Sequence, residues 1–122
     1  MSRQDFKHVQ VASDVVLSAM PFDHSRLAHS TMHDTELQRE VVGLFMIQLK
    51  ETRDRLEGAP LSSEDRKFLS HNLRGAASAI GALQIEELAK CWEKVGFDPK
   101  VLSALLQQAE IEFLELTSTY LS

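Results

Sequence analysis

The pattern of apolar and polar residues along this chain is that of amphipathic helices. Apolar side chains recur every three or four positions, the spacing that places them on one face of an α-helix. No stretch shows the strict alternation of apolar and polar residues that is typical of a half-buried strand. We predict one short and four long helices, over about residues 22–30, 34–57, 62–80, 83–95 and 98–120.

Helix-capping residues stand at most of the predicted ends. Asp, Ser and Thr favour the N-cap because their side-chain oxygens accept free backbone N–H groups, and a Gly after the last turn ends a helix. Asp65, three residues after Ser62, completes a pattern like a capping box, and Pro99 follows Asp98 at a first helical position. The candidate N-caps are Asp23 or Ser25, Asp34 or Thr35, Ser62 and Asp98, and the stop signals are Gly58, Gly81 and Gly96.

These elements predict the fold class. Amphipathic helices cannot bury their apolar faces alone, and short connections favour antiparallel neighbours. We therefore predict an all-α fold, an antiparallel up-down-up-down four-helix bundle with an extra short N-terminal helix or arm. The bundle is expected over residues 22–122. Residues 1–21, rich in valine before Pro21, are expected to form an arm, helical or extended, that could pack on the bundle.

Composition narrows the class of protein. The chain has 122 residues, about one domain, and 43% of them are apolar, enough for a core. Its 13 basic and 18 acidic residues give a net charge of −5, which argues against a general nucleic-acid binder. The single cysteine, Cys91, can form no internal disulfide. Without a signal segment or an apolar run of membrane-spanning length, we expect a cytoplasmic protein. We also expect it to be a monomer.

His71 is the candidate for chemistry. On a helical wheel, with about 100° per residue, it lies almost opposite the predicted buried stripe of its helix. That stripe comprises Leu69, Leu73, Ala76, Ala77 and Ile80. Lys67 and Arg74 flank the histidine one turn away on either side, Gly75 follows one turn later, and Ser78 lies along the same row. Packing does not explain a histidine that faces solvent between two cations.

A phosphoryl group would explain this arrangement. Histidine titrates near neutral pH, so an exposed imidazole offers a neutral ring nitrogen to an incoming phosphoryl group. Nearby cations stabilise the charge on the transferring group, and Gly75 leaves the approach to the ring open. We expect Lys67, Arg74, Gly75 and Ser78 to assist a phosphoryl group on His71. Alone, these residues would be an ordinary solvated helix face.

The motif around His71 resembles that of a known family. The run His71-Asn72-Leu73-Arg74-Gly75 resembles the His-x-Leu-Lys-Gly signature of histidine phosphotransfer (HPt) domains of two-component phosphorelays, with Arg in place of Lys. Residues 78–82 are similar to the small-residue stretch that follows it. Residues 88–93 resemble a family helix with Leu, Cys and Glu, although the acid stands one position early. Phe22-Asp23 also fits, and the resemblance covers roughly residues 22–94.

The resemblance implies a function. Members of the family carry phosphate on one exposed histidine, here His71, and exchange it with aspartates of response-regulator receiver domains in a phosphorelay fed by a hybrid histidine kinase. It implies a bacterial-type phosphoprotein with no kinase activity and no ATP site, and the sequence has no P-loop or glycine-rich nucleotide motif. It also implies no cofactor on this chain, because Mg²⁺ is held by the receiver.

A second surface is predicted on the 34–57 helix. Its inner stripe is expected to be Leu37, Val41, Leu44, Phe45, Gln48, Thr52 and Leu56. Val42, Met46 and Leu49 fall to one side of that stripe, and apolar residues outside a core often mark a binding surface. We predict that these three residues help dock the receiver domain. The alternative is that they pack against the N-terminal arm.

Other functions remain as alternatives. His24, His29 and His33 have partly helical spacing, but without a His-Glu-x-x-His pattern or a thiolate we expect no metal site. Cys91 is expected to be interior or half-buried rather than a nucleophile. The chain could instead be a dimeric kinase-like or kinase-regulating helical adaptor, in which His71 is not phosphorylated.

Overall fold

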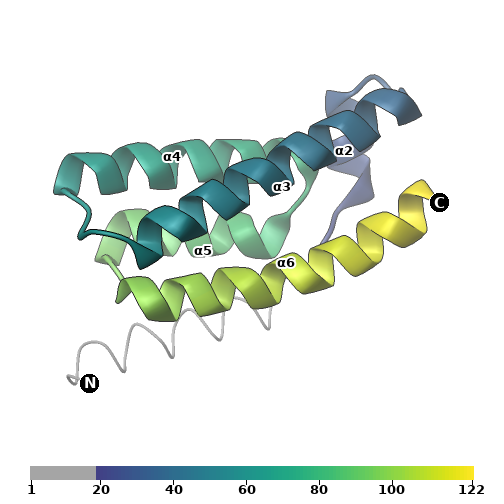
Figure 1. The fold of residues 1–122 in the computed structure, drawn as a ribbon. Coiled ribbons are helices and arrows are strands. Elements are labelled where there is room, and N and C mark those ends of the chain that lie inside the picture. Colours follow the sequence, from purple (N-terminus) through teal and green to yellow (C-terminus); the bar gives the residue numbers. More distant parts are fainter. Residues whose placement is uncertain (1–18) are drawn as a thin grey trace.

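The computed structural model describes residues 19–122, which form five helices and no strand (Figure 1). The helices are α2 (His24–Ser30), α3 (Thr35–Glu57), α4 (Ser63–Ile80), α5 (Leu83–Val95) and α6 (Pro99–Leu121). These bounds agree with the predicted ones to within one or two residues. Most of the predicted N-terminal arm, residues 1–18, lies outside the described residues.

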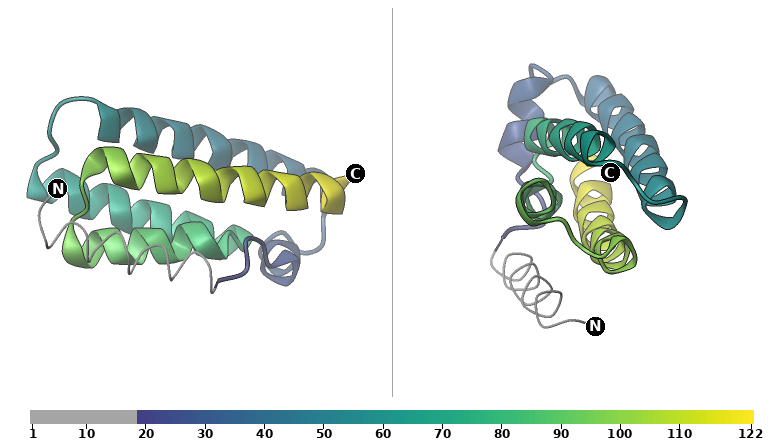
Figure 2. Two further views of the ribbon diagram at one scale, coloured as in Figure 1. Left: turned by 90° about the horizontal axis from the view of Figure 1, so that it is seen from below. Right: turned by 90° about the vertical axis from the view of Figure 1, so that its left-hand side faces the viewer.

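The four long helices form an antiparallel bundle. Along the chain α3, α4, α5 and α6 alternate in direction, and seen end-on they surround one core (Figure 2). The closest packing is that of α4 on α5 and of α3 on α6, while α2 packs across the end of α4. The predicted bundle with a short N-terminal helix is confirmed. None of the helices within residues 19–122 is both long and apolar enough to cross a membrane.

Local capping fixes where these helices begin. Asp23, Asp34, Ser62 and Asp98 are the N-caps of α2, α3, α4 and α6, and each side chain accepts a backbone N–H of its helix. Such caps satisfy backbone donors that have no partner inside the helix, and each contributes roughly 1 kcal/mol. The sequence predictions for these four starts are confirmed.

The connection between α4 and α5 also holds α2 in place. Gly81 ends α4 with φ of 79°, a left-handed conformation that glycine adopts without strain. Its carbonyl oxygen accepts the backbone N–H of Asp23 at 2.8 Å. Phe22 is buried next to this bond, and its ring meets those of Phe113 and Tyr120 edge-on, with centroids 5.5 and 5.6 Å away.

The rotation of α3 differs from the prediction. Leu44, assigned to the inner stripe, is 66% exposed, whereas Val42 and Leu49 are 7% and 0% exposed. Met46 is half-buried and packs against the same core. The prediction that Val42, Met46 and Leu49 form a docking surface is therefore wrong.

Contacts with α6 explain the rotation. Apolar residues cover more than one face of α3, so the pattern alone leaves the inward face open. Arg53 of α3 forms an ion pair with Glu110 of α6 at 3.1 Å, and Arg39 donates to the carbonyl oxygen of Leu121 at 2.7 Å. These contacts place that side of α3 against α6, which turns Val42 and Leu49 into the core.

Candidate functional site

His71 lies in the middle of α4 and is exposed to solvent. The opposite face of the helix is held in the core by Leu73 and Ala77, both 0% exposed, and by Ile80 at 5%. Because three side chains spaced along α4 are buried, the helix cannot rotate without exposing them. The fold therefore presents His71 outward from a rigid helix, as predicted.

The surface around His71 has two different sides. By helical geometry, Phe68 and Gly75 fall about 40–60° to one side of His71, toward α3, while Lys67 and Arg74 fall about 40–60° to the other, toward α5. Phe68 is 66% exposed, although it is a large apolar residue. A group that reaches the imidazole thus passes between an apolar side and a cationic side.

Arg74 contacts His71 directly. One of its terminal nitrogens lies 3.4 Å from Nδ1 of His71. Because a guanidinium can only donate, a hydrogen bond between these atoms requires Nδ1 to accept, which places the proton of a neutral ring on Nε2. The other terminal nitrogen of Arg74 pairs with Glu93 of α5 at 3.2 Å. Arg74 therefore joins the imidazole of α4 to a carboxylate on the neighbouring helix.

Glu93 was not among the predicted site residues. It lies 19 positions from Arg74 in the sequence, so the contact depends on the packing of α4 against α5. The signal that could have found it was its place in the 88–93 segment, where the family resemblance has an acid one position later. Its side chain is 30% exposed and that of Arg74 is 37%, so the pair is partly shielded from solvent.

Lys67 and Gly75 complete the immediate surroundings of His71. Lys67 is exposed, and its ammonium group forms no ion pair with any other residue between 19 and 122, so it is free to meet an anion. A Cβ atom added at Gly75 would meet no atom within 4 Å. Gly75 therefore leaves open space on the surface one turn after His71.

Ser78 is not part of this group. It lies seven residues after His71, which corresponds to about 10 Å along the helix. Its hydroxyl oxygen accepts a hydrogen bond from Arg26 of α2 at 3.2 Å, and the same nitrogen of Arg26 pairs with Glu86 at 3.1 Å. Ser78 helps to tie α2 to α4 and does not reach a phosphoryl group on His71, so we leave it out of the site.

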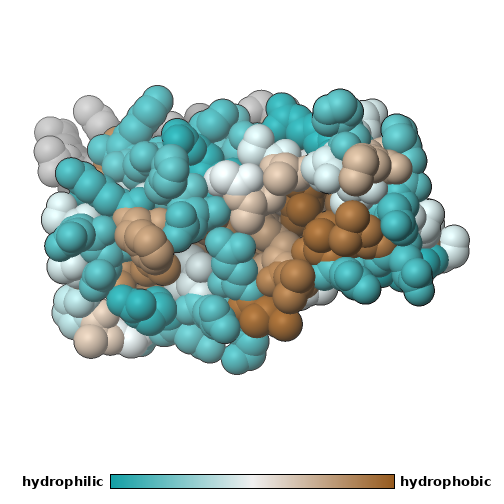
Figure 3. All heavy atoms as spheres, turned by 90° about the horizontal axis from the view of Figure 1, so that it is seen from above, coloured by the Kyte–Doolittle hydropathy of each residue, from teal (hydrophilic) through white to brown (hydrophobic). Residues whose placement is uncertain are grey.

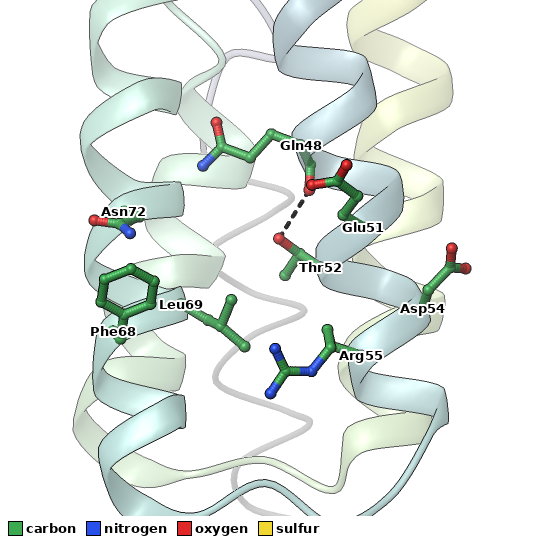
Figure 4. Close-up of a pocket in the computed structure, with 8 residues that line it drawn as sticks. All are labelled: Gln48, Glu51, Thr52, Asp54, Arg55, Phe68, Leu69 and Asn72. Carbon is green, nitrogen blue, oxygen red and sulfur yellow. Dashed lines mark hydrogen bonds between the residues drawn. The ribbon is translucent and has the colours of Figure 1, made fainter.

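A groove runs between α3 and α4 on the apolar side of His71. Phe68, Leu69 and Asn72 of α4 line it opposite Gln48, Thr52 and Arg55 of α3, and its volume is about 560 Å³ (Figure 4). Exposed apolar residues continue along α3, where Leu44 and Ile47 are 66% and 58% exposed. In the space-filling view, apolar groups gather over α3 and α4 within a mainly polar surface (Figure 3).

The remaining chemical groups are separate from His71. His24 stacks on Tyr120, with ring centroids 5.3 Å apart, and within residues 19–122 no three His, Cys, Asp or Glu side chains are grouped to hold a metal ion. Cys91 is half-buried, as predicted. Its burial, and then the nearby charge of Glu87, raise the pKa of the thiol above its usual value despite the opposing effect of Lys94. A raised pKa keeps the thiol protonated and unreactive near neutral pH.

The residues around His71 suit the binding of an anionic group to the imidazole, and they include few other reactive groups. One imidazole, two cations and an open approach are arranged on a rigid helix, without a second acid, base or nucleophile in contact with His71 among the described residues. Comparisons of the chain with protein-family models, with curated proteins and with solved structures found no match.

Proposed function

We propose that this protein is a histidine-containing phosphocarrier of the HPt kind, which relays a phosphoryl group between receiver-domain aspartates through His71. The observation that carries the proposal is the exposed imidazole on a rigid helix with the Arg74 guanidinium 3.4 Å from its Nδ1. The proposed partners are response-regulator receiver domains and a hybrid histidine kinase, in the cytoplasm of a bacterial-type phosphorelay.

The proposed transfer follows from the chemistry of the ring. A nitrogen of neutral imidazole must have its lone pair free to attack phosphorus, and Nδ1 is occupied by Arg74. When Arg74 turns from Nδ1 to an oxygen of the arriving phosphoryl group, the ring proton can reside on Nδ1 and Nε2 can attack. The bond between phosphorus and the aspartyl oxygen breaks, and its electron pair leaves with the receiver's carboxylate. Mg²⁺ in the receiver's acidic pocket would stabilise the same charge.

The proposal assigns no kinase activity to this chain. Its residues supply the nucleophile, then the leaving group for the return transfer, and the surface that the receiver meets. The apolar side of that surface comprises Phe68 of α4 with Leu44 of α3, in place of the buried residues first predicted for docking. A monomer suffices, because one copy supplies all of these groups.

Phosphoryl transfer from a panel of radiolabelled phospho-receivers tests the proposal. We expect the purified full-length protein to acquire label that is lost in acid and kept in alkali, as a phosphohistidine would be. Label that is stable in acid, or no label from a panel that charges a control HPt domain, would contradict the proposal and favour a helical adaptor.

Gly75 offers a test that separates stability from access. We expect Gly75→Gln to raise the free energy of unfolding by roughly 0.5 kcal/mol, because glycine disfavours the middle of a helix. The same change should slow transfer by about tenfold to a hundredfold, because a side chain one turn after His71 leans back over the ring. Urea unfolding and the rate of labelling measure the two effects.

Gly43 provides the matched control for this test. It is an exposed glycine inside α3, and a Cβ added there would also meet no atom within 4 Å. A second hollow between α3 and α4 is lined by Val41, Leu44 and Gln48 of α3, and on the helical wheel Gly43 falls on another side of α3. Gly43→Gln should stabilise the protein similarly and leave transfer unchanged. Equal labelling rates for the two variants would show that access to the His71 ring does not depend on the missing side chain at Gly75.

Arg74 is expected to contribute through its charge. We predict that Arg74→Met slows labelling by about tenfold to a hundredfold, since it removes a cationic donor from the transferring group. Arg74→Lys should restore most of the rate. Both variants should unfold at nearly the same urea concentration as the wild type, because partly exposed ion pairs contribute little to stability. A normal rate for Arg74→Met would remove Arg74 from the mechanism.

Glu93 is expected to act only by positioning Arg74. Glu93→Gln should slow labelling less than Arg74→Met does. In a double-mutant cycle, Glu93→Gln should have no further effect on the rate when Arg74 is already replaced by Met, because Glu93 acts only through Arg74. Additive effects would assign Glu93 a role of its own.

A further inference from the structure

A pocket with an arginine at its edge lies at the end of the bundle, where the α3–α4 connection meets the α5–α6 connection. Its volume is about 460 Å³. Its walls are largely apolar, formed by Leu56, Leu61, Trp92 and Phe97. The guanidinium side chain of Arg66 and the hydroxyl groups of Ser62 and Ser63 are its polar components.

Arg66 is exceptional among the cations of residues 19–122. Its side chain is half-buried, and its Nε, like that of Arg53, is buried with no hydrogen-bond partner. The other half-buried basic residues of the described chain, Arg53, Arg74 and Lys90, each pair with a glutamate. Arg66 forms no such pair. A half-buried charge without a counter-charge is unfavourable, so an anion that meets the guanidinium from the pocket would stabilise this arrangement.

The backbone beside Arg66 is shaped to accept its head group. Gly96 ends α5 with φ of 64°, and a Cβ atom there would collide with Nη1 of Arg66. Glycine therefore lets the guanidinium lie directly against the end of α5, beside Trp92 and Phe97. The group is held at the pocket and does not extend into solvent, as an arginine at this position otherwise could.

The nearby carboxylates do not neutralise Arg66. Asp65 pairs with Arg55 at 3.5 Å, and Asp98 accepts the backbone N–H groups of Lys100 and Val101. The oxygen of Ser62 accepts the N–H of Asp65, which leaves its hydroxyl hydrogen free to donate. The pocket thus offers one fixed positive charge and free donors over an apolar floor.

We propose that this pocket binds a carboxylate that carries an apolar body. A planar guanidinium matches a carboxylate through two parallel hydrogen bonds, and one positive charge balances one negative charge. The apolar body would lie against Trp92 and Phe97. The carboxylate belongs either to a small molecule or to the C-terminal residue of a peptide, and both sources present the same chemistry.

Trp92 provides the readout. It is the only tryptophan of the chain and lines the pocket, so its fluorescence reports an aromatic ligand there. We would titrate the full-length protein with phenylacetate and, as a neutral control, with phenylacetamide. A peptide ending in phenylalanine, with a free or an amidated C-terminus, distinguishes the two sources. Arg66→Met removes the charge while keeping an apolar stem. The matched control is Lys50→Met, at an exposed cation of α3 that pairs with Asp54 and does not line the pocket.

We expect saturable binding of phenylacetate that is weakened about tenfold or more in Arg66→Met and unchanged in Lys50→Met. Phenylacetamide should bind correspondingly weakly. Tighter binding of the free-acid peptide than of phenylacetate would identify a chain terminus as the source, and the reverse a small molecule. Absence of saturable phenylacetate binding would overturn the proposal. So would phenylacetate that binds Arg66→Met as tightly as the wild type, or phenylacetamide that binds the wild type as tightly as phenylacetate.

Discussion

Replacing His71 by Gln is expected to abolish phosphoryl acceptance. Glutamine has a similar size and can form hydrogen bonds, but its amide nitrogen has no lone pair available to attack phosphorus. Because His71 is exposed and opposite the buried face of α4, the substitution should leave the fold intact. We therefore expect no label on His71→Gln after transfer from a phospho-receiver that labels the wild type.

Two other histidines provide the control. His29 and His33 are also exposed, but they lie on or just after α2, away from the cations that flank His71. His29→Gln and His33→Gln should accept label at the wild-type rate. If label instead persists on His71→Gln and disappears from one of these variants, the phosphorylated residue is not His71.

Substituting Gly81 by Ala is expected to have the largest effect on stability. Gly81 has φ of 79°, and a Cβ atom there would collide with the carbonyl oxygen of Asp23. Alanine would therefore strain the backbone and also displace Asp23, whose N–H donates to the Gly81 carbonyl. We predict a loss of about 2–4 kcal/mol in the free energy of unfolding, measured by urea denaturation.

Gly58 is the control for this prediction. It also follows a helix, α3, but its φ is −90°, and an added Cβ would make only ordinary contacts, at 3.4 Å or more. Gly58→Ala should change stability by only a few tenths of a kcal/mol. Similar losses for the two variants would show that the left-handed turn at Gly81 is not what holds α2 in place.

The helix ends could be predicted from the sequence because they depend on local interactions. Asp34 and Ser62 cap their own helices through bonds that span three residues, and Gly81 allows the turn that ends α4. The exposed position of His71 was predictable for a similar reason. Its helix has a single well-defined apolar stripe, and burial of that stripe fixes the opposite face.

Features that depend on neighbouring helices could not be predicted. The inward face of α3 is set by its contacts with α6, which the apolar pattern of α3 does not encode, and Val42 and Leu49 were misplaced for that reason. The same holds for Glu93, which meets Arg74 only because α4 and α5 pack together. The contact of Ser78 with Arg26 likewise depends on where α2 lies.

A relay between two receivers tests the central claim most directly. One receiver would be radiolabelled on its aspartate and mixed with a second, unlabelled receiver in the presence of Mg²⁺. We predict that label appears on the second receiver only when the wild-type protein is added, after passing through an acid-labile intermediate on it. Transfer that is equally fast without the protein, or with His71→Gln in its place, would contradict the proposed function.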